Sequence, residues 1–293
     1  MDVSLVVDTL KLASVYAMLA VGFVIVYRTS RVLNLTQPGV VLLGGLLALS
    51  LLPATGGSGG ARFWLVAVGL VALGAVAGFA LYGLLLRPMA GQSRISQVLM
   101  TLAALFLLEA VAEAGWRGQS SFLPMPGKET SWEILGAHVR LLDVVPIGVT
   151  AVVFAGLGLF YRFSPSGVQM RAVAENPALA ARRGINIERI GALAWGLASA
   201  LGVLAMFLAT TQGSVSPLLV GTALKGFTVA LVAGLDSIGG LLPAALLVAV
   251  AEVLTVRFLD QQLGEAVPYV VLLGVLLVKP WGLAGTREEL DRV

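Results

Sequence analysis

The sequence predicts an all-α, polytopic membrane protein with about eight or nine transmembrane helices, some of them broken. Of its 293 residues, 58% are hydrophobic and only 12% are charged, whereas soluble domains carry roughly 25% charge. Apolar runs of about 20 residues, long enough to cross a hydrocarbon layer about 30 Å thick, recur along the chain. These runs do not alternate with period two, so we expect helices and not a barrel.

Nine apolar segments are expected to be helical. In chain order they cover residues 8–27, 38–52, 63–86, 95–115, 142–163, 190–210, 222–235, 241–258 and 267–278. The second begins near Pro38, because proline is tolerated in the first turn of a helix and penalised inside one. Asn34 to Gln37 therefore form irregular backbone before it. The seventh segment is short, and if it only re-enters the membrane the count falls to eight.

The cations predict how the chain is oriented. If the polar stretch 162–189 is cytoplasmic, alternation places 12 of the 19 Lys and Arg residues inside, in agreement with the positive-inside rule. These twelve are Arg28, Arg31, Arg87, Arg94, Arg162, Arg171, Arg182, Arg183, Arg189, Lys279, Arg287 and Arg292. Nine crossings then put the N-terminus outside and the C-terminus inside, with 116–141 as an outer loop. We expect a single transmembrane domain over 1–293 and no nucleic-acid partner, because the cations are spread over many loops.

Little in the sequence supports an enzyme. The chain has one histidine, His138, and no cysteine, which leaves little scope for a metal site of the His/Cys type. It also lacks the G-x-x-x-x-G-K-[ST] phosphate loop, so it does not bind ATP in that manner. We therefore expect no catalytic residue, no metal and no cofactor. If ATP drives this protein, another subunit must supply the energy.

Two polar breaks, each followed by a small-residue helix, lie in the two halves of the chain, and paired breaks of this kind indicate a transport path. In the first, Asn34, Thr36 and Gln37 offer uncharged hydrogen-bonding groups to a small polar solute, or they cap the next helix. In the second, Gly234 and Gly239 permit a helix or a solute to approach the backbone closely. Glycine and proline are also common in membrane helices, which leaves a purely structural alternative open.

Ionisable residues inside a membrane are costly and are functional candidates by default. Glu252 lies deep within the segment 241–258. Glu109 and Glu113 share one helix face and lie nearer to an outer end. The alternative for each of them is an interhelix hydrogen bond or a side chain that reaches the membrane interface.

The stretch 162–189 is the longest run that is polar and charged yet helix-like. Asn176 followed by Pro177 is typical of a helix start, and Gly184 after two arginines is typical of a helix end. We predict a short helix parallel to the membrane, alanine-rich on one face and basic on the other. Such a helix suits the docking of a cytoplasmic partner, and it suits equally well a helix held on the membrane surface by anionic lipid head groups.

Four sequence blocks resemble one known family, the permease subunits of branched-chain amino acid ABC importers. The stretch RFSPSGVQMRAVAENPALAARRGIN resembles the cytoplasmic coupling loop of that family through Gly167, Arg171, Ala172, Ala174, Glu175, Ala180, Gly184, Ile185 and Asn186. The block KGFTVALVAGLDSIGGLLPAALLVAVAEVL is similar to a second family motif through Lys225, Phe227, Thr228, Gly234, Ser237, Ile238, Gly240, Ala251 and Glu252. Shorter matches involve Leu33, Asn34 and Gly44, and Arg87 and Pro88.

The resemblance implies a permease subunit of an ABC importer for branched-chain or other small amino acids, in the cell inner (plasma) membrane. It implies as partners two cytoplasmic ATPase subunits, a second permease subunit (in a homo- or heterodimer) and an extracytoplasmic solute-binding protein. The implied ATPase-coupling residues are Arg171, Ala174, Glu175, Asn176, Ala180 and Gly184. The candidate residues of the translocation path are Asn34, Thr36, Gln37, Gly234, Ser237, Gly239 and Glu252.

Two departures from the family pattern lie near the expected path. Gln37, Pro38 and Gly39 stand where the family usually has His-Gly-Glu, and Asp236 stands where it has a glycine. Since relatives in the family serve urea and short amides, such solutes remain open. The alternative function is a stand-alone, ion-coupled secondary carrier or channel for a small polar solute such as urea or an amide, with Glu252 or Glu113 as the working acid.

Overall fold

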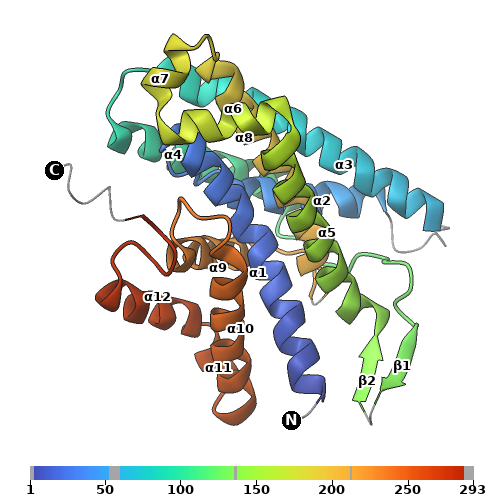
Figure 1. Ribbon diagram of the computed structural model, residues 1–293. Coiled ribbons are helices and arrows are strands. Elements are labelled where there is room, and N and C mark those ends of the chain that lie inside the picture. The colour runs from blue at the N-terminus through green and yellow to red at the C-terminus, as the bar shows by residue number, and fades with distance from the viewer. Residues whose placement is uncertain (1–2, 53–59, 135–136, 212, 287–293) are drawn as a thin grey trace.

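The computed structural model describes residues 3–52, 60–134, 137–211 and 213–286 and is almost entirely helical (Figure 1). All nine predicted apolar segments form helices. They are α1 (Val3–Ser30), α2 (Gln37–Leu51), α3 (Gly60–Leu81), α4 (Arg94–Trp116), α5 (Leu141–Phe163), α8 (Ile187–Ala209), α9 (Leu219–Ala233), α10 (Leu241–Phe258) and α12 (Val267–Val278). The prediction of an all-α, polytopic membrane protein is therefore confirmed.

Shorter elements complete the described chain. They are a π-turn η1 (Tyr82–Leu86), a 3-10 turn η2 (Arg87–Met89), strands β1 (Ser131–Ile134) and β2 (Ala137–Arg140), and helices α6 (Pro165–Glu175), α7 (Pro177–Arg182) and α11 (Gln261–Gly264). The two strands form an antiparallel hairpin in which Trp132 lies opposite Val139. Sequence reasoning did not anticipate this hairpin inside the loop 116–141, because its strands are short and polar.

Among the described residues, six helices are long and apolar enough to cross a membrane: α1, α4, α5, α8, α10, and α3 together with the short η1 and η2 helices at its end. The remaining three, α2, α9 and α12, have 15, 15 and 12 residues. At about 1.5 Å per residue they are roughly 18–23 Å long, which is less than the hydrocarbon thickness of about 30 Å. The polar interruptions in the sequence predicted this for α2 and α9, whereas the shortness of α12 was not predicted from an interruption.

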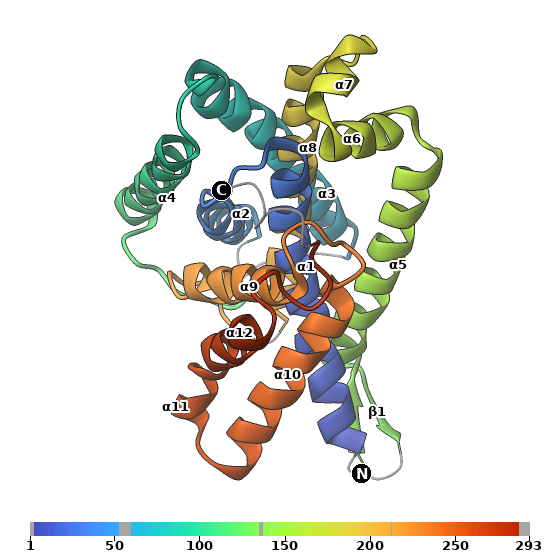
Figure 2. The same cartoon turned by 60° about the vertical axis from the view of Figure 1, so that its left-hand side comes forward.

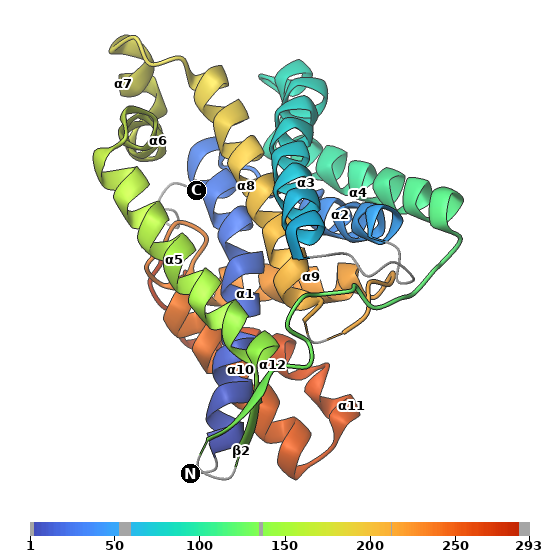
Figure 3. The same cartoon turned by 90° about the vertical axis from the view of Figure 1, so that its right-hand side faces the viewer.

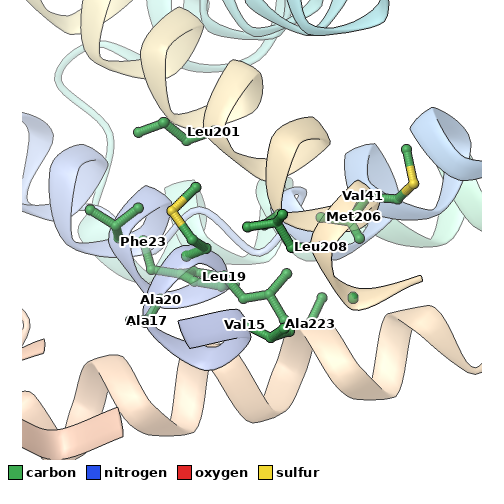
Figure 4. Close-up of a cluster of buried hydrophobic side chains, with 14 of the residues drawn as sticks. Val15, Ala17, Leu19, Ala20, Phe23, Val41, Leu201, Met206, Leu208 and Ala223 are labelled. Carbon is green, nitrogen blue, oxygen red and sulfur yellow. The ribbon is translucent and has the colours of Figure 1, made fainter. Parts of the chain in front are cut away.

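Helix α1 lies at the centre of the molecule. It packs against α8, α10, α9 and α5 (Figure 2), and 89% of its most apolar 18-residue window is buried. A helix that is enclosed on all sides needs apolar residues all round, as its sequence has. Figure 4 shows the resulting core, in which Phe23 and Leu19 of α1 lie among side chains of α2, α8 and α9.

Helix α8 lies between α1 and α3 (Figure 3). Its contact with α3 depends on two glycines one turn apart, Gly74 and Gly78. A Cβ atom on Gly78 would lie 2.3 Å from the carbonyl oxygen of Trp195, and one on Gly74 would lie 2.8 Å from a methyl group of Val203. Small residues at this spacing let two membrane helices approach until their backbones touch.

The outer ring of helices presents apolar side chains to its surroundings. Leu65 and Val68 of α3, Leu99 of α4 and Val152 of α5 are all more than half exposed. In a soluble protein such faces would promote aggregation, whereas in a bilayer they contact the lipid tails. The buried helices α1 and α8 and the exposed apolar faces of α3, α4 and α5 thus fit a protein that is surrounded by lipid.

The positive-inside rule placed several helix ends on the cytoplasmic side of the membrane. In the structure, two of these ends are in direct contact. Arg87 forms an ion pair of 3.2 Å with Glu188, which joins the end of η2 to the start of α8. At the other end, Lys11 of α1 forms an ion pair of 2.7 Å with Asp143 of α5. Which end faces the cytoplasm remains a prediction, and Arg287 and Arg292 lie outside the described residues.

Candidate translocation path and coupling surface

The first polar break forms a closed hydrogen-bond network. The Oδ1 atom of Asn34 accepts a hydrogen bond of 3.2 Å from the Thr36 backbone and a second from the Thr36 hydroxyl group. The Nδ2 atom of Asn34 donates to Gln37 at 3.5 Å. All three side chains are almost fully buried. Their hydrogen-bonding groups therefore meet other protein groups in this structure.

Gln37 lies where three helices cross. Its Nε2 atom donates a hydrogen bond of 2.9 Å to the carbonyl oxygen of Ala198 in α8. It fits there because two glycines make room: a Cβ atom would lie 2.6 Å from Nε2 on Gly22 of α1 and 2.3 Å from it on Gly202 of α8. This side chain thus sets the position of α2 against α1 and α8.

Thr101 of α4 holds the same break from the other side. Its hydroxyl group donates to the carbonyl oxygen of Leu33 at 2.9 Å and accepts from the Leu35 backbone at 3.2 Å. Sequence reasoning missed Thr101, Gly22 and Gly202. For Thr101, the available signal was a polar residue within an apolar helix, and this signal does not reveal which group the side chain contacts.

At the second break, Gly234 permits a close approach to another part of the chain's own backbone, whereas a Cβ atom on Gly239 would meet no atom within 4 Å. Gly234 has φ +96°, a conformation that favours glycine. A Cβ atom there would lie 2.6 Å from the backbone nitrogen of Gly285. Beside it, Leu283 donates a hydrogen bond of 2.8 Å to the carbonyl oxygen of Val232. The segment after α12 therefore closes over the end of α9.

Ser237 and Gly239 occupy the turn that follows. The hydroxyl group of Ser237 accepts a hydrogen bond of 3.1 Å from the backbone of Gly240 and so stabilises the start of α10. Gly239 is exposed and borders a cavity of about 610 Å³ together with Arg28 and Arg171. The turn thus lies near the last turn of α1, the end of that helix that is closest to α6 and α7.

Glu252 belongs to a cluster of charged side chains inside the protein. Its carboxylate accepts a hydrogen bond of 2.6 Å from the hydroxyl group of Tyr16 and one of 3.0 Å from Lys225. Lys225 also forms an ion pair of 2.9 Å with Glu265, which follows α11. The side chains of Lys225 and Glu252 are 8% and 10% exposed, and that of Glu265 is 78% exposed. Buried charges are retained when they are paired in this way.

These charged groups line a cavity of about 690 Å³. Its walls come from the first half of α1, the residues between α8 and α9, and the start of α9, in the half of the molecule that lies away from α6 and α7 (Figure 1). Sequence reasoning named Glu252 as a path candidate but did not identify Lys225 as its partner. The available signal was that a lysine within an apolar segment needs a carboxylate.

Glu109 and Glu113 belong to a separate cavity of about 480 Å³, between α4, α2 and α9. Glu109 is half-buried and Glu113 is exposed. The structure therefore does not bring these two acids together with Glu252.

The coupling candidates lie on α6 and α7, two short helices at one end of the molecule (Figure 1). The side chain of Asn176 accepts a hydrogen bond of 2.9 Å from the Leu179 backbone, which confirms the predicted helix start. Gly184 ends the turn after α7 with φ +80°, as predicted for a helix stop. The preceding helix α6 begins in the same manner, with Ser164 as its cap.

The coupling candidates divide into exposed and anchoring groups. Arg171, Glu175, Asn176 and Gly184 are exposed, whereas Ala180 is only 4% exposed and faces the core. The backbone oxygen of Ala174 accepts a hydrogen bond of 3.2 Å from Arg31, the residue after α1. The segment therefore offers a polar outer face and is attached to the central helix from beneath.

Comparison with known proteins shows which family has this arrangement. Residues 5–276 match the family model described as branched-chain amino acid transport system, permease component. The chain is 27% identical to the high-affinity branched-chain amino acid transport system permease protein LivH of Salmonella typhimurium, covering 96% of this chain and 94% of the relative. It is 28% identical to BraD of Pseudomonas aeruginosa, another high-affinity permease protein of such a system, covering 98% and 96%.

The similarity reaches beyond bacteria. A probable branched-chain amino acid transport permease protein LivH of Methanocaldococcus jannaschii is 26% identical, covering 93% of this chain and 89% of the relative. No solved structure matches this chain. The family and the apolar helices make the protein a multi-pass component of the inner membrane that serves transport. The chain belongs to the family of permease components of branched-chain amino acid transport systems.

Proposed function

We propose that this chain is the translocation subunit of an ABC importer that carries branched-chain or related small aliphatic amino acids inward. The observation that carries the proposal is the family match over residues 5–276, together with an exposed helix pair at one end of a chain without a phosphate loop of its own. Two cytoplasmic ATPase subunits would supply the energy through that helix pair.

The coupling step follows from the attachment of α6 and α7. Met170 and Val173 of α6 are buried against the core, and Arg31 binds the carbonyl oxygen of Ala174. A displacement of the exposed face, with Arg171 and Glu175, would therefore move the end of α1. Because α1 packs against most of the other helices, the whole inner ring would follow.

The path would run beside α1. In this proposal the cavity at Glu252 admits the solute, and Asn34, Thr36 and Gln37 hold the crossing of α1, α2 and α8 that must shift to let it pass. Gly234, Ser237 and Gly239 would form the turn through which the α9–α10 pair responds to the coupling helices. The outer loops, of which 116–141 is the longest, would receive the solute-binding protein.

The remaining partners follow from the same scheme. A second permease subunit, either a copy of this chain or a related one, would complete the transmembrane part. The chain would act as one transmembrane domain over 1–293, with 162–189 as its cytoplasmic coupling segment. Membrane lipid would surround the exposed apolar faces of α3, α4 and α5.

Cysteine cross-linking tests whether α7 is the ATPase contact. The chain contains no cysteine, so Ala178→Cys, on the exposed side of α7, provides a single reactive group. In membranes that also contain the two ATPase subunits, we expect a reagent with one thiol-reactive and one photoreactive group to link this residue to an ATPase subunit.

The matched control is Glu133→Cys, an exposed residue of β1 at the opposite end of the molecule, which should form no such link. Cross-linking of Glu133→Cys but not Ala178→Cys would show that the ATPases bind elsewhere. The lipid-surface interpretation of α7 would then replace the docking interpretation.

A further inference from the structure

The cavity beside Glu252 has a composition that selects one class of solute. It is lined by one cation and two carboxylates, Lys225, Glu252 and Glu265, and by the hydroxyl groups of Ser216 and Thr222. Apolar side chains from α1 and α9, such as Val15 and Leu219, complete the wall. Its volume of about 690 Å³ lies within the range of roughly 300–1,000 Å³ that small-molecule sites occupy.

The three charged groups are not equivalent. Lys225, Glu252 and Tyr16 form a buried set in which the lysine and the glutamate neutralise each other. Glu265 adds a second carboxylate to the same lysine from the exposed surface. Exposed ion pairs contribute little to stability, because solvent screens them and ordering the side chains costs entropy. Glu265 can therefore leave Lys225 at low cost, whereas Glu252 cannot.

We propose that this cavity binds a zwitterionic α-amino acid by exchange of ion-pair partners. The carboxylate of the solute takes the place of Glu265 on Lys225. The released Glu265 then accepts the α-ammonium group, and the aliphatic side chain lies against the apolar wall. A zwitterion leaves the net charge of the cavity unchanged, because it brings one carboxylate for Lys225 and one ammonium group for the released Glu265. A carboxylate alone would add to the excess of negative charge, and an amine alone would offer Lys225 no replacement for Glu265. The proposal rests on the proposed function and adds a binding site and a class of ligand to it.

A labelling experiment tests the site without requiring transport. In the assembled complex without ATP, Thr222→Cys would provide a single thiol in the cavity, and Ser50→Cys an exposed thiol outside it. L-Leucine should slow the reaction of a small polar thiol reagent with Thr222→Cys and not with Ser50→Cys. The deaminated analogue 4-methylpentanoate and the decarboxylated analogue 3-methylbutylamine should protect much less. Equal protection by all three compounds, or by none, would overturn the proposal.

Transport by the complete importer supplies the second test. The double variant Lys225→Met/Glu252→Gln removes the ion pair without leaving a buried charge alone, and Glu265→Gln changes only the exposed partner. Both should lower ATP-driven leucine uptake at least about tenfold, the loss expected when a charged hydrogen bond to the solute is removed. The matched control is Lys11→Met/Asp143→Asn, a buried pair outside the cavity, which should retain uptake.

The outcomes separate the two proposals. If uptake depends on ATP but is unchanged in Glu265→Gln and in the Lys225 double variant, the site is overturned and the importer function stands. If uptake shows no ATP dependence in the unmodified complex, the importer function fails, whatever the labelling shows. A loss of uptake in the control pair equal to that in the cavity variants would assign a purely structural role to Lys225.

Discussion

At the scale of single residues, a few buried polar side chains form hydrogen bonds between helices and so help to determine where the helices cross. Gln37 joins α2 to α8 by one hydrogen bond, and Thr101 joins α4 to the break before α2. In a membrane, little hydrophobic force acts between helices, because lipid tails are as apolar as their side chains. Close packing at glycines and a few hydrogen bonds must therefore specify the arrangement.

The glycine contact between α3 and α8 gives the first residue-scale prediction. In Gly78→Ala, the new methyl group would lie 2.3 Å from the Trp195 carbonyl oxygen, so one of the two backbones must move. Overpacking of this kind costs about 1–3 kcal/mol. We expect a matching loss of stability in thermal or denaturant unfolding of the protein in detergent.

The control lies on the same helix. Gly69→Ala places its methyl group in open space, with no atom within 4 Å, and alanine is favoured over glycine in a helix by about 0.5–1 kcal/mol. This variant should be as stable as the unmodified protein or slightly more stable. Equal destabilisation by both changes would show that α3 does not pack on α8 through Gly78.

At the scale of elements, α6 and α7 pack against each other, and local residues determine where each helix begins. Each helix has a side-chain cap followed by proline, at Ser164–Pro165 and at Asn176–Pro177. Gly184 then turns the chain back toward α8 with φ +80°. If the ATPases act on the outer face, as we propose, the contacts of α6 and α7 would pass a displacement to α1 and α8.

Gly184→Ala tests the transmission. Alanine in the left-handed region is strained by about 1–2 kcal/mol, although its methyl group would meet no atom within 4 Å. We expect the complex to assemble and hydrolyse ATP, with a roughly tenfold loss of uptake per ATP. Gly91→Ala is the control, because Gly91 has φ +86° and the same open space but lies in the turn before α4. If both variants lost the same amount of uptake per ATP, backbone strain at either position would explain the loss, and Gly184 would have no special role in coupling.

The sequence allowed the helices to be predicted well, and for a physical reason. A membrane helix must satisfy its own backbone, so length and hydrophobicity alone locate it; 241–258 and 267–278 agree with α10 and α12 at both ends. Asn176, Pro177 and Gly184 identified α7 because caps are local signals. Pairings were not predictable in this way. Long-range packing determines the contact of Lys225 with Glu252 and that of Gly234 with Gly285. No local sequence pattern predicts such contacts.

At the scale of the whole molecule, α1 connects the proposed coupling surface to the charged cavity. Its last turn is followed by Arg31, which binds α6, and its first half carries Tyr16, which binds Glu252. One continuous helix of 28 residues, buried over most of its length from residue 9 onward, thus contacts both candidate regions. A movement at one end of α1 has a direct route to the other.

Reconstitution into proteoliposomes tests the central claim most directly. The complete complex, with this chain, its ATPases, a second permease subunit and the solute-binding protein, should accumulate L-leucine against its gradient only when ATP is supplied. Removal of either ATP or the binding protein should abolish accumulation. Uptake of leucine, urea or a short amide by this chain alone, driven by an ion gradient and without ATP, would contradict the account and favour a secondary carrier.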